Sequence, residues 1–276
     1  IIFVGDPAQL PPVGEERSEA LNAEFFRAKG LDVCEAELTE VVRQGGMSAI
    51  LKNAMSVRRI LNSVQRNSFS MTLNPGEVEQ LAEGTLVERY VAERQASGRN
   101  NCVLIAYTNE KVRGYNVDIR QRLFGDTIFS LNVGEVLVVT QNNYKLEKMN
   151  GDFVEVAEVG DIVSRNVPII VDNGGVKEKV LFLLNFIHVK IANQNDWSWL
   201  YLDLLFNSNA SLTIEEQKAL FIDFRIRHKG LLPQTQEFAE KLKEDEFYNC
   251  LRAKFGYAVT GHKCQGGEWG NVFVDF

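Results

Sequence analysis

The sequence predicts an α/β protein that carries a small antiparallel β-barrel as an insertion. Apolar runs at 1–4 and 102–107 are each followed by a helical pattern, and strands that alternate with helices favour a parallel sheet. The stretch 125–192 differs, because short β-rich segments there are separated by the turn dipeptides Asn150-Gly151 and Asn173-Gly174. Short strands joined by tight turns indicate a small barrel.

The length of 276 residues fits about two domains of ordinary size. The first α/β domain is expected to cover 1–75. The second is expected to be discontinuous, because two insertions interrupt it. Its two parts are 76–124 and 250–276, and the insertions are the barrel at 125–192 and a helical segment at 193–249.

Local patterns place the individual elements. Helices are expected at 15–28, 47–64, 77–95, 110–123, 214–227 and 236–247. Asn109 is a suitable N-cap for the helix at 110–123. Strands are expected at 1–4, 33–38, 102–107, 133–140, 153–159, 167–171, 179–191, 257–260 and 271–275.

Composition argues against several classes of protein. The net charge of −7 means that any nucleic-acid surface has to be local. The four cysteines lack the paired spacing of a zinc site, so we expect no metal ligands and a reducing, cytoplasmic location. No apolar run approaches the roughly 18–20 residues of a membrane span, so we expect no membrane contact.

The first candidate site is the string Gly5-Asp6-Pro7-Ala8-Gln9-Leu10-Pro11-Pro12-Val13, directly after the apolar run at 1–4. Ligands of open α/β sheets bind beyond the carboxyl ends of strands, where this string is expected. The amide of Gln9 both donates and accepts without carrying a charge, which suits contact with a γ-phosphate or its attacking water. Pro11 and Pro12 stiffen the loop. An ordinary strand-to-loop turn is the alternative, and it explains a lone Gly-Asp pair but not the whole string.

A second candidate is Arg43, which follows the segment 38–42. Its planar guanidinium donors match phosphate oxygens and remain charged at neutral pH. A surface arginine at the start of a helix is the alternative for this residue taken alone. Its place after the string at 5–13 favours the phosphate contact.

Two segments of the second α/β domain offer contacts to a nucleic-acid backbone. Thr108 and Asn109 follow the strand at 102–107 and suit a phosphate through a hydroxyl and helix N-terminal amides, although Asn109 serves equally well as a simple helix cap. The string Thr260-Gly261-His262-Lys263-Cys264-Gln265-Gly266-Gly267-Glu268 is denser in polar groups.

Each polar type in that second string suits a different contact. Thr260 and His262 offer neutral hydrogen bonds to a phosphate, and Lys263 adds a point charge. Gly266 and Gly267 let backbone amides approach closely. Glu268 suits a nucleotide ribose or a neighbouring basic group. A solvated surface loop is the alternative for the histidine or the lysine alone.

Together these strings resemble motifs III, IV and V of superfamily-one helicases. The resemblance is to the branch of the RecD and Dda-like DNA helicases, and so to the exodeoxyribonuclease V alpha subunit. The resemblance implies two RecA-like P-loop NTPase motor domains, both incomplete here, with an inserted SH3-like β-barrel at 125–192. Gly261 departs from the larger residue of the family pattern, which affects local packing. The segment 193–249 resembles nothing that we can assign.

The resemblance also implies roles for single residues. Gln9 and Arg43 would be catalytic. The nucleotide contacts would be Gly5, Asp6, Gln9, Arg43, Gly266 and Glu268. The DNA contacts would be Pro11, Pro12, Thr108, Asn109, Thr260, His262, Lys263 and Gln265.

The implied parent protein is an ATP-dependent DNA helicase of 5′-to-3′ polarity that couples ATP hydrolysis to translocation on single-stranded DNA. Its cofactors would be ATP and Mg²⁺, and its partners single-stranded DNA and recombination or repair proteins. The alternative is a non-catalytic DNA- or protein-binding module built on the barrel. Gln9 and Arg43 favour the motor, because a binding module needs no γ-phosphate contacts.

We expect this 276-residue chain not to hydrolyse ATP by itself. The sequence contains no GxxxxGK[ST] string, which cradles the phosphates and supplies a Mg²⁺ ligand in P-loop enzymes. That electrostatic stabilisation is the main catalytic contribution in phosphoryl transfer. Phosphate release by the purified chain is measured with and without single-stranded DNA, and release well above a blank would refute the expectation.

Overall fold

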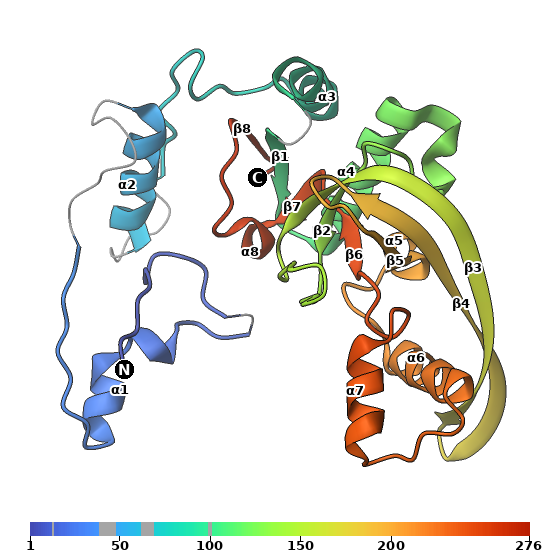
Figure 1. The fold of residues 1–276 in the computed structure, drawn as a ribbon. Coiled ribbons are helices and arrows are strands. Elements are labelled where there is room, and N and C mark those ends of the chain that lie inside the picture. Colours follow the sequence, from blue (N-terminus) through green and yellow to red (C-terminus); the bar gives the residue numbers. More distant parts are fainter. Residues whose placement is uncertain (13, 39–47, 62–68, 99–100) are drawn as a thin grey trace. The chain divides into compact units, whose positions relative to one another are not determined.

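The protein folds as two compact units, Ile1–Glu83 and Gly84–Phe276. A computed structural model describes residues 1–12, 14–38, 48–61, 69–98 and 101–276. The fold is mixed α/β, with a parallel and an antiparallel sheet that both belong to the second unit (Figure 1). The boundary between the units lies at 83–84 in the chain, whereas the predicted boundary is at 75–76.

The described part of the first unit contains short helices joined by loops. The strand predicted at 1–4 is wrong, because these residues are exposed and pair with no strand among the described residues. Apolar composition alone does not make a strand, since its amides and carbonyls need a neighbouring strand. The strand predicted at 33–38 is wrong for the same reason. The elements present are η1 (Glu19–Leu21), α1 (Ala23–Ala28) and α2 (Ala49–Leu61).

Two interruptions explain why helices of this unit differ from the prediction. Asn22 has an extended backbone and caps α1, so the single helix predicted at 15–28 is split. Glu77 accepts hydrogen bonds from the Ser48 side chain and the Ala49 amide at the start of α2, and these bonds lower the pKa of Glu77 to about 2. The helix predicted at 77–95 begins later, at Leu86, because Glu77 accepts hydrogen bonds from the start of α2 instead of starting a helix itself.

A three-stranded parallel sheet forms the first part of the second unit, in the order β7-β1-β8. The central strand β1 pairs with both neighbours and is almost wholly buried, which explains its uniformly apolar sequence. Helices α3 and α4 pack beside it (Figure 1). The bounds are α3 Leu86–Ser97, β1 Cys102–Ala106, α4 Asn109–Phe124, β7 Ala258–Thr260 and β8 Asn271–Val274.

A five-stranded antiparallel sheet is inserted in the chain between α4 and β7, in the order β5-β4-β3-β2-β6. The strands predicted separately at 153–159 and 167–171 are one long strand that forms a hairpin with its successor. The hairpin turn predicted from Asn173-Gly174 is present, and its residues Gly174 and Gly175 both have positive φ. The bounds are η2 Gly125–Phe129, β2 Val136–Val139, β3 Phe153–Asn173, β4 Val176–Ile191, β5 Trp197–Tyr201 and β6 Ala253–Phe255.

The inserted sheet does not close into the predicted barrel. Its two edges touch at a single bridge, where the Tyr201 amide donates to the Leu251 carbonyl (3.0 Å) and the Leu251 amide donates to the Trp199 carbonyl (2.7 Å). The sheet also takes β5 and β6 from outside the predicted range 125–192. Closure would need strands long enough to pair along both edges, and these two edge strands are short.

Helices from the predicted helical segment pack on the β3–β4 hairpin. Leu220 shares a buried core with Val167 and Leu184. The helix predicted at 214–227 is confirmed, and a capping box between Thr213 and Glu216 begins it. The next helix ends earlier than predicted, because the Asp245 carboxylate accepts from amides beyond it. The bounds are α5 Leu202–Phe206, α6 Ile214–Arg227 and α7 Gln236–Glu244.

A buried ion pair joins the two sheets of the second unit. Arg120 of α4 donates to both carboxylate oxygens of Glu135 at 2.9–3.2 Å, and both side chains are at most 3% exposed. The Tyr257 hydroxyl donates to the same carboxylate (2.8 Å), and its pKa is raised by burial and by Glu135. Arg120 also lies 3.6 Å from the ring centroid of Phe255, so its charge is compensated on several sides.

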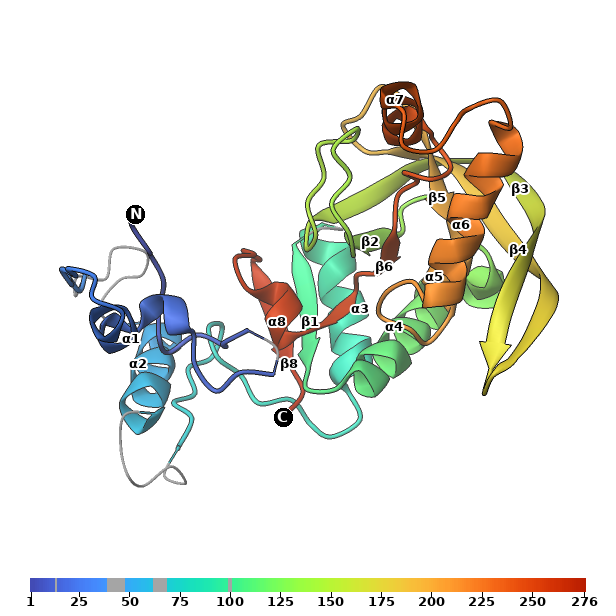
Figure 2. The ribbon, with the colours of Figure 1, turned by 90° about the horizontal axis from the view of Figure 1, so that it is seen from below.

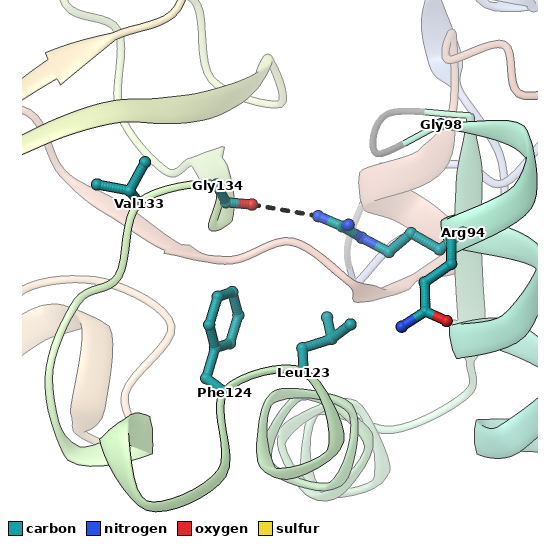
Figure 3. Close-up of a pocket in the computed structure, with 7 residues that line it drawn as sticks. Arg94, Gly98, Leu123, Phe124, Val133 and Gly134 are labelled. Carbon is teal, nitrogen blue, oxygen red and sulfur yellow. Dashed lines mark hydrogen bonds between the residues drawn. The ribbon is translucent and has the colours of Figure 1, made fainter.

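Arg94 of α3 makes a second link to the loop before β2, because its Nη2 donates to the Gly134 carbonyl at 3.2 Å (Figure 3). A cavity of about 340 Å³ lies beside this contact, with Phe124 among its lining residues. It is lined by the ends of α3 and α4, at the amino edge of the parallel sheet. None of the predicted site residues lines it.

We expect Glu135→Gln to lower the free energy of unfolding by about 3–5 kcal/mol, because it leaves the buried Arg120 charge without its partner. Urea unfolding followed by circular dichroism measures the change. Glu246→Gln is the matched control, since the Lys145–Glu246 pair is more than half exposed and should contribute much less. A loss for Glu135→Gln no larger than that of the control would contradict the role given to the pair.

Candidate functional site

The carboxyl edge of the parallel sheet brings together the predicted residues that follow β1 and β7. Ala106, which ends β1, lies opposite Thr260, which ends β7, so the segments that follow these strands start side by side. Asp275 joins them after β8, and its amide donates to the Ile105 carbonyl (2.9 Å). Figure 2 shows the short helix α8 (Gly261–Cys264) beside β1 at this edge.

Thr108, not Asn109, caps α4. Thr108 has an extended backbone, and its hydroxyl oxygen accepts from the Lys111 amide at 3.2 Å. Asn109 is the first helical residue and its side chain is exposed, so the predicted N-cap is wrong by one position. The reason is that a capping side chain must lie just before the helix, with its oxygen turned back to the third amide. The hydroxyl proton of Thr108 remains able to donate.

Lys111 and Asp275 form an ion pair at this edge, with 2.8 Å between Nζ and Oδ2. The hydrogen bond to Asp275 raises the pKa of Lys111, so this lysine stays charged well above neutral pH. Burial raises the pKa of the neighbouring Tyr115, and Asp275 adds to the effect. The Asp275 carboxylate, which follows β8, is therefore already neutralised by Lys111 of α4.

Lys263 carries the second positive charge of the edge. Its Nζ donates to the Oδ1 of Asn150, in the loop between β2 and β3. The side chain is half-buried, and burial lowers its pKa. Among the described residues no carboxylate lies within ion-pair distance of Lys263. Its charge is thus held by a neutral amide, which leaves it available to an anion.

Asn116 fixes the strand that leads into the second string. It is buried on α4, and its Oδ1 accepts from the amides of Tyr257 and Ala258, both at 3.1 Å. Its Nδ2 donates to the carbonyls of Ala258 and Val112, both at 2.9 Å. One side chain on the helix after β1 therefore positions β7, and with it the segment from Thr260 onward.

The loop after α8 packs against the inserted sheet. A Cβ on Gly267 would lie 2.0 Å from the Trp269 ring, and the ring contacts Phe153 of β3 edge-on at 5.3 Å. The Gly267 amide already donates to the Cys264 carbonyl (3.1 Å), so this glycine serves packing rather than ligand approach. Gly266 has φ +83°, which suits glycine. The remaining polar side chains of the string that are exposed are His262, Gln265 and Glu268.

The string at 5–12 in the first unit forms a turn organised by Asp6. Its carboxylate accepts from the Ala8 amide (3.0 Å) and pairs with Arg58 of α2 (3.2 Å). The Gln9 amide donates to the Asp6 carbonyl (3.1 Å), while its side chain is exposed. A Cβ on Gly5 would lie 2.8 Å from a terminal methyl group of Leu21, so a larger residue here would require that side chain to move. Within the string Pro11 is half-buried and Pro12 is exposed.

The predicted residues fall into two groups. Gly5, Asp6, Gln9, Pro11 and Pro12 lie in the first unit. Val13 and Arg43 lie outside the described residues. In the second unit, the residues that directly follow β1 and β7 lie at the carboxyl edge of the parallel sheet, and they are Thr108, Asn109, Thr260, His262 and Lys263. Gln265, Gly266 and Glu268 lie in the loop that leads from α8 back to the start of β8, where Asn271 pairs with Cys102 at the other end of β1.

Comparisons with known proteins assign no family. No family model matches the chain, and no curated protein matches it at a significant level. None of the helices in the described ranges is long and apolar enough to cross a bilayer. Those ranges also contain no group of three or more His, Cys, Asp or Glu side chains arranged to hold a metal ion. Any functional conclusion therefore depends on the motifs and the site.

Sequence reasoning missed Lys111, Asp275 and Asn150. Asp275 follows β8 as Thr108 follows β1, so the parallel-strand argument applied to the third strand would have found it. Lys111 could then have been inferred as the partner of Asp275, because it lies in the first turn of the helix that Thr108 caps. No local signal identifies Asn150, because its contact with Lys263 depends on how the β2–β3 loop folds over α8.

We expect Asn116→Asp to lower the free energy of unfolding by about 2–3 kcal/mol. The change is nearly isosteric, but it replaces the Nδ2 donor with a carboxylate oxygen facing the Ala258 carbonyl in a buried site. Thermal or urea unfolding measures the loss. Asn195→Asp, at an exposed position, is the control and should change stability by no more than about 0.5 kcal/mol. Equal stability of the two variants would show that Asn116 does not hold β7.

Proposed function

We propose that this chain is part of an ATP-dependent DNA helicase of superfamily one, and that its second unit grips the phosphates of single-stranded DNA. One observation carries the proposal. The carboxyl edge of the β7-β1-β8 sheet brings Thr108 next to the segment Thr260–Lys263, although the two are far apart in the sequence. Hydroxyl, imidazole and ammonium groups at a strand-to-helix edge suit a phosphate chain.

The groups at this edge divide the work of phosphate binding. Hydroxyl groups of Thr108 and Thr260 donate neutral hydrogen bonds, as does the exposed imidazole of His262. Lys263 supplies a charge that only a neutral amide holds among the described residues. Neutral donors and one charge hold a backbone without fixing it, which suits a strand that must slide. Phosphate contacts carry no base information, so affinity should not depend on sequence.

Nucleotide chemistry needs more than the described residues supply. The Asp6 carboxylate is already bound to Arg58 and to the Ala8 amide, so it does not fit a Mg²⁺ ligand in this arrangement. The sequence also contains no phosphate-cradling GxxxxGK[ST] string. Gln9 is exposed and neutral, which suits contact with a γ-phosphate presented by the rest of a longer protein. ATP binding is therefore proposed for that longer protein.

The architecture of the second unit is compatible with one of the two motor folds implied by the motifs, whereas the described residues of the first unit form no sheet. A parallel sheet flanked by helices suits part of a RecA-like domain. The five-stranded sheet takes the place in the chain of the expected SH3-like barrel, but it is an open sheet whose edges meet at one bridge. The 5′-to-3′ polarity and the recombination or repair partners belong to this proposal through the motif resemblance alone.

We expect Lys263→Ala to weaken binding of single-stranded DNA to the same extent on two oligonucleotides of unrelated sequence. Removing one phosphate contact should also reduce the slope of log affinity against log salt by about 0.7. Fluorescence anisotropy across a salt series measures both quantities. Lys241→Ala on α7 is the control, because this exposed lysine lies on a helix that contributes no residue of the site. Unchanged affinity together with an unchanged slope would remove Lys263 from the DNA path.

A further inference from the structure

A chain of hydrogen bonds leads from the phosphate-binding edge to an exposed aromatic ring. Lys263 donates to the Asn150 side chain, and the Asn150 amide donates to the Oδ1 of Asn142 (2.8 Å). The Nδ2 of Asn142 in turn donates to the Tyr144 hydroxyl (3.4 Å). The Tyr144 side chain is nevertheless 74% exposed. An aromatic ring is thus tethered by its polar end, close to the lysine, while most of its surface faces water.

The loop that carries Tyr144 is well anchored. Asn143 and Lys148 exchange two backbone hydrogen bonds (2.7 and 3.0 Å). The Asn143 side chain is buried, accepts from the Leu146 amide and donates to the Asn249 carbonyl. Leu146 is buried in the main core of the unit. The ring therefore lies on a fixed loop, so little conformational entropy is lost from the loop when a base stacks on the ring.

A second exposed tyrosine lies at the carboxyl edge of the parallel sheet. Tyr107 lies directly between β1 and the cap of α4, and it is 90% exposed. It precedes Thr108, one of the proposed phosphate contacts. Exposure alone does not distinguish these rings, because Phe129 is 85% exposed as well. Their connection to the proposed phosphate contacts does, since Tyr107 adjoins Thr108 and Tyr144 is linked to Lys263 through Asn142 and Asn150.

We propose that Tyr107 and Tyr144 are base-stacking residues for the single strand whose phosphates are held at Lys263. This inference rests on the proposed function and names the part of the ligand that its phosphate contacts leave unbound. Nucleobases stack on aromatic rings in sequence-independent binding sites, because every base has a π-face. The edge would hold the strand from two sides of the nucleotide, with charge on the phosphate and rings on the bases.

The test compares Tyr107→Ala, Tyr144→Ala and Tyr144→Phe with the unaltered chain, using a fluorescent oligothymidylate and an abasic oligomer of equal length. Each alanine variant should lose affinity for the oligothymidylate by about tenfold, while the salt slope stays unchanged because no phosphate contact is removed. Tyr144→Phe should retain most of the affinity, since its ring is intact. The abasic oligomer should bind all of these proteins with the same, weaker affinity.

Phe129→Ala is the matched control. Phe129 is 85% exposed on η2, which follows the carboxyl end of α4 and so lies at the opposite end of that helix from Tyr107. It should leave affinity unchanged. Circular dichroism checks that each variant is folded.

The outcomes separate this inference from the function on which it rests. If Lys263→Ala weakens binding and the tyrosine variants do not, the stacking proposal is wrong and the phosphate site stands. An equal loss on the abasic oligomer would likewise overturn stacking, because no base is present there. Failure of the unaltered chain to bind any oligonucleotide would overturn both.

Discussion

The buried pair of Arg120 and Glu135 is the constraint on which the second unit depends. A long insertion separates β1 from β7, so the chain must leave the parallel sheet and return to it in register. Arg120 lies on the helix that leaves, Glu135 begins the inserted sheet, and Tyr257, which binds the same carboxylate, immediately precedes the returning strand. Because burying charges is favourable only when their partners are in place, this network specifies one relative placement of the two sheets.

Local patterns predicted the elements that depend on local interactions. The strand at 102–107, the helix at 214–227 and the turn at Asn173-Gly174 were predicted from an apolar run, a helical pattern and a turn dipeptide, which are all local features of the sequence. The prediction of a strand at 1–4 was wrong because apolar composition does not show whether a pairing strand is present. The predicted barrel differs for a similar reason: β5 and β6 come from distant segments whose pairing no local pattern encodes.

The candidate site was predictable as a set of residue types but not as an arrangement. Thr260 and Lys263 could be singled out from their string, and parallel-strand logic brings Thr108 to the same edge. The hydrogen bonds by which Asn116 and Asn150 position them act across loops and between helix and strand, so these contacts emerge only from the fold. Asn109 shows the limit of boundary prediction, where one residue decides between a capping role and an exposed helical position.

The interrupted parallel sheet has a consequence for the order in which the protein is built. Leu104 pairs with Ala258, so β1 must await synthesis of the whole insertion before that pairing can form, whereas the β3–β4 hairpin can zip from its own turn. During translation β1 is an apolar strand with unpaired edges, the kind of intermediate that favours misassembly. The DNA-facing edge proposed for this unit would thus be among the last features to appear, assembled on a frame that folded before it.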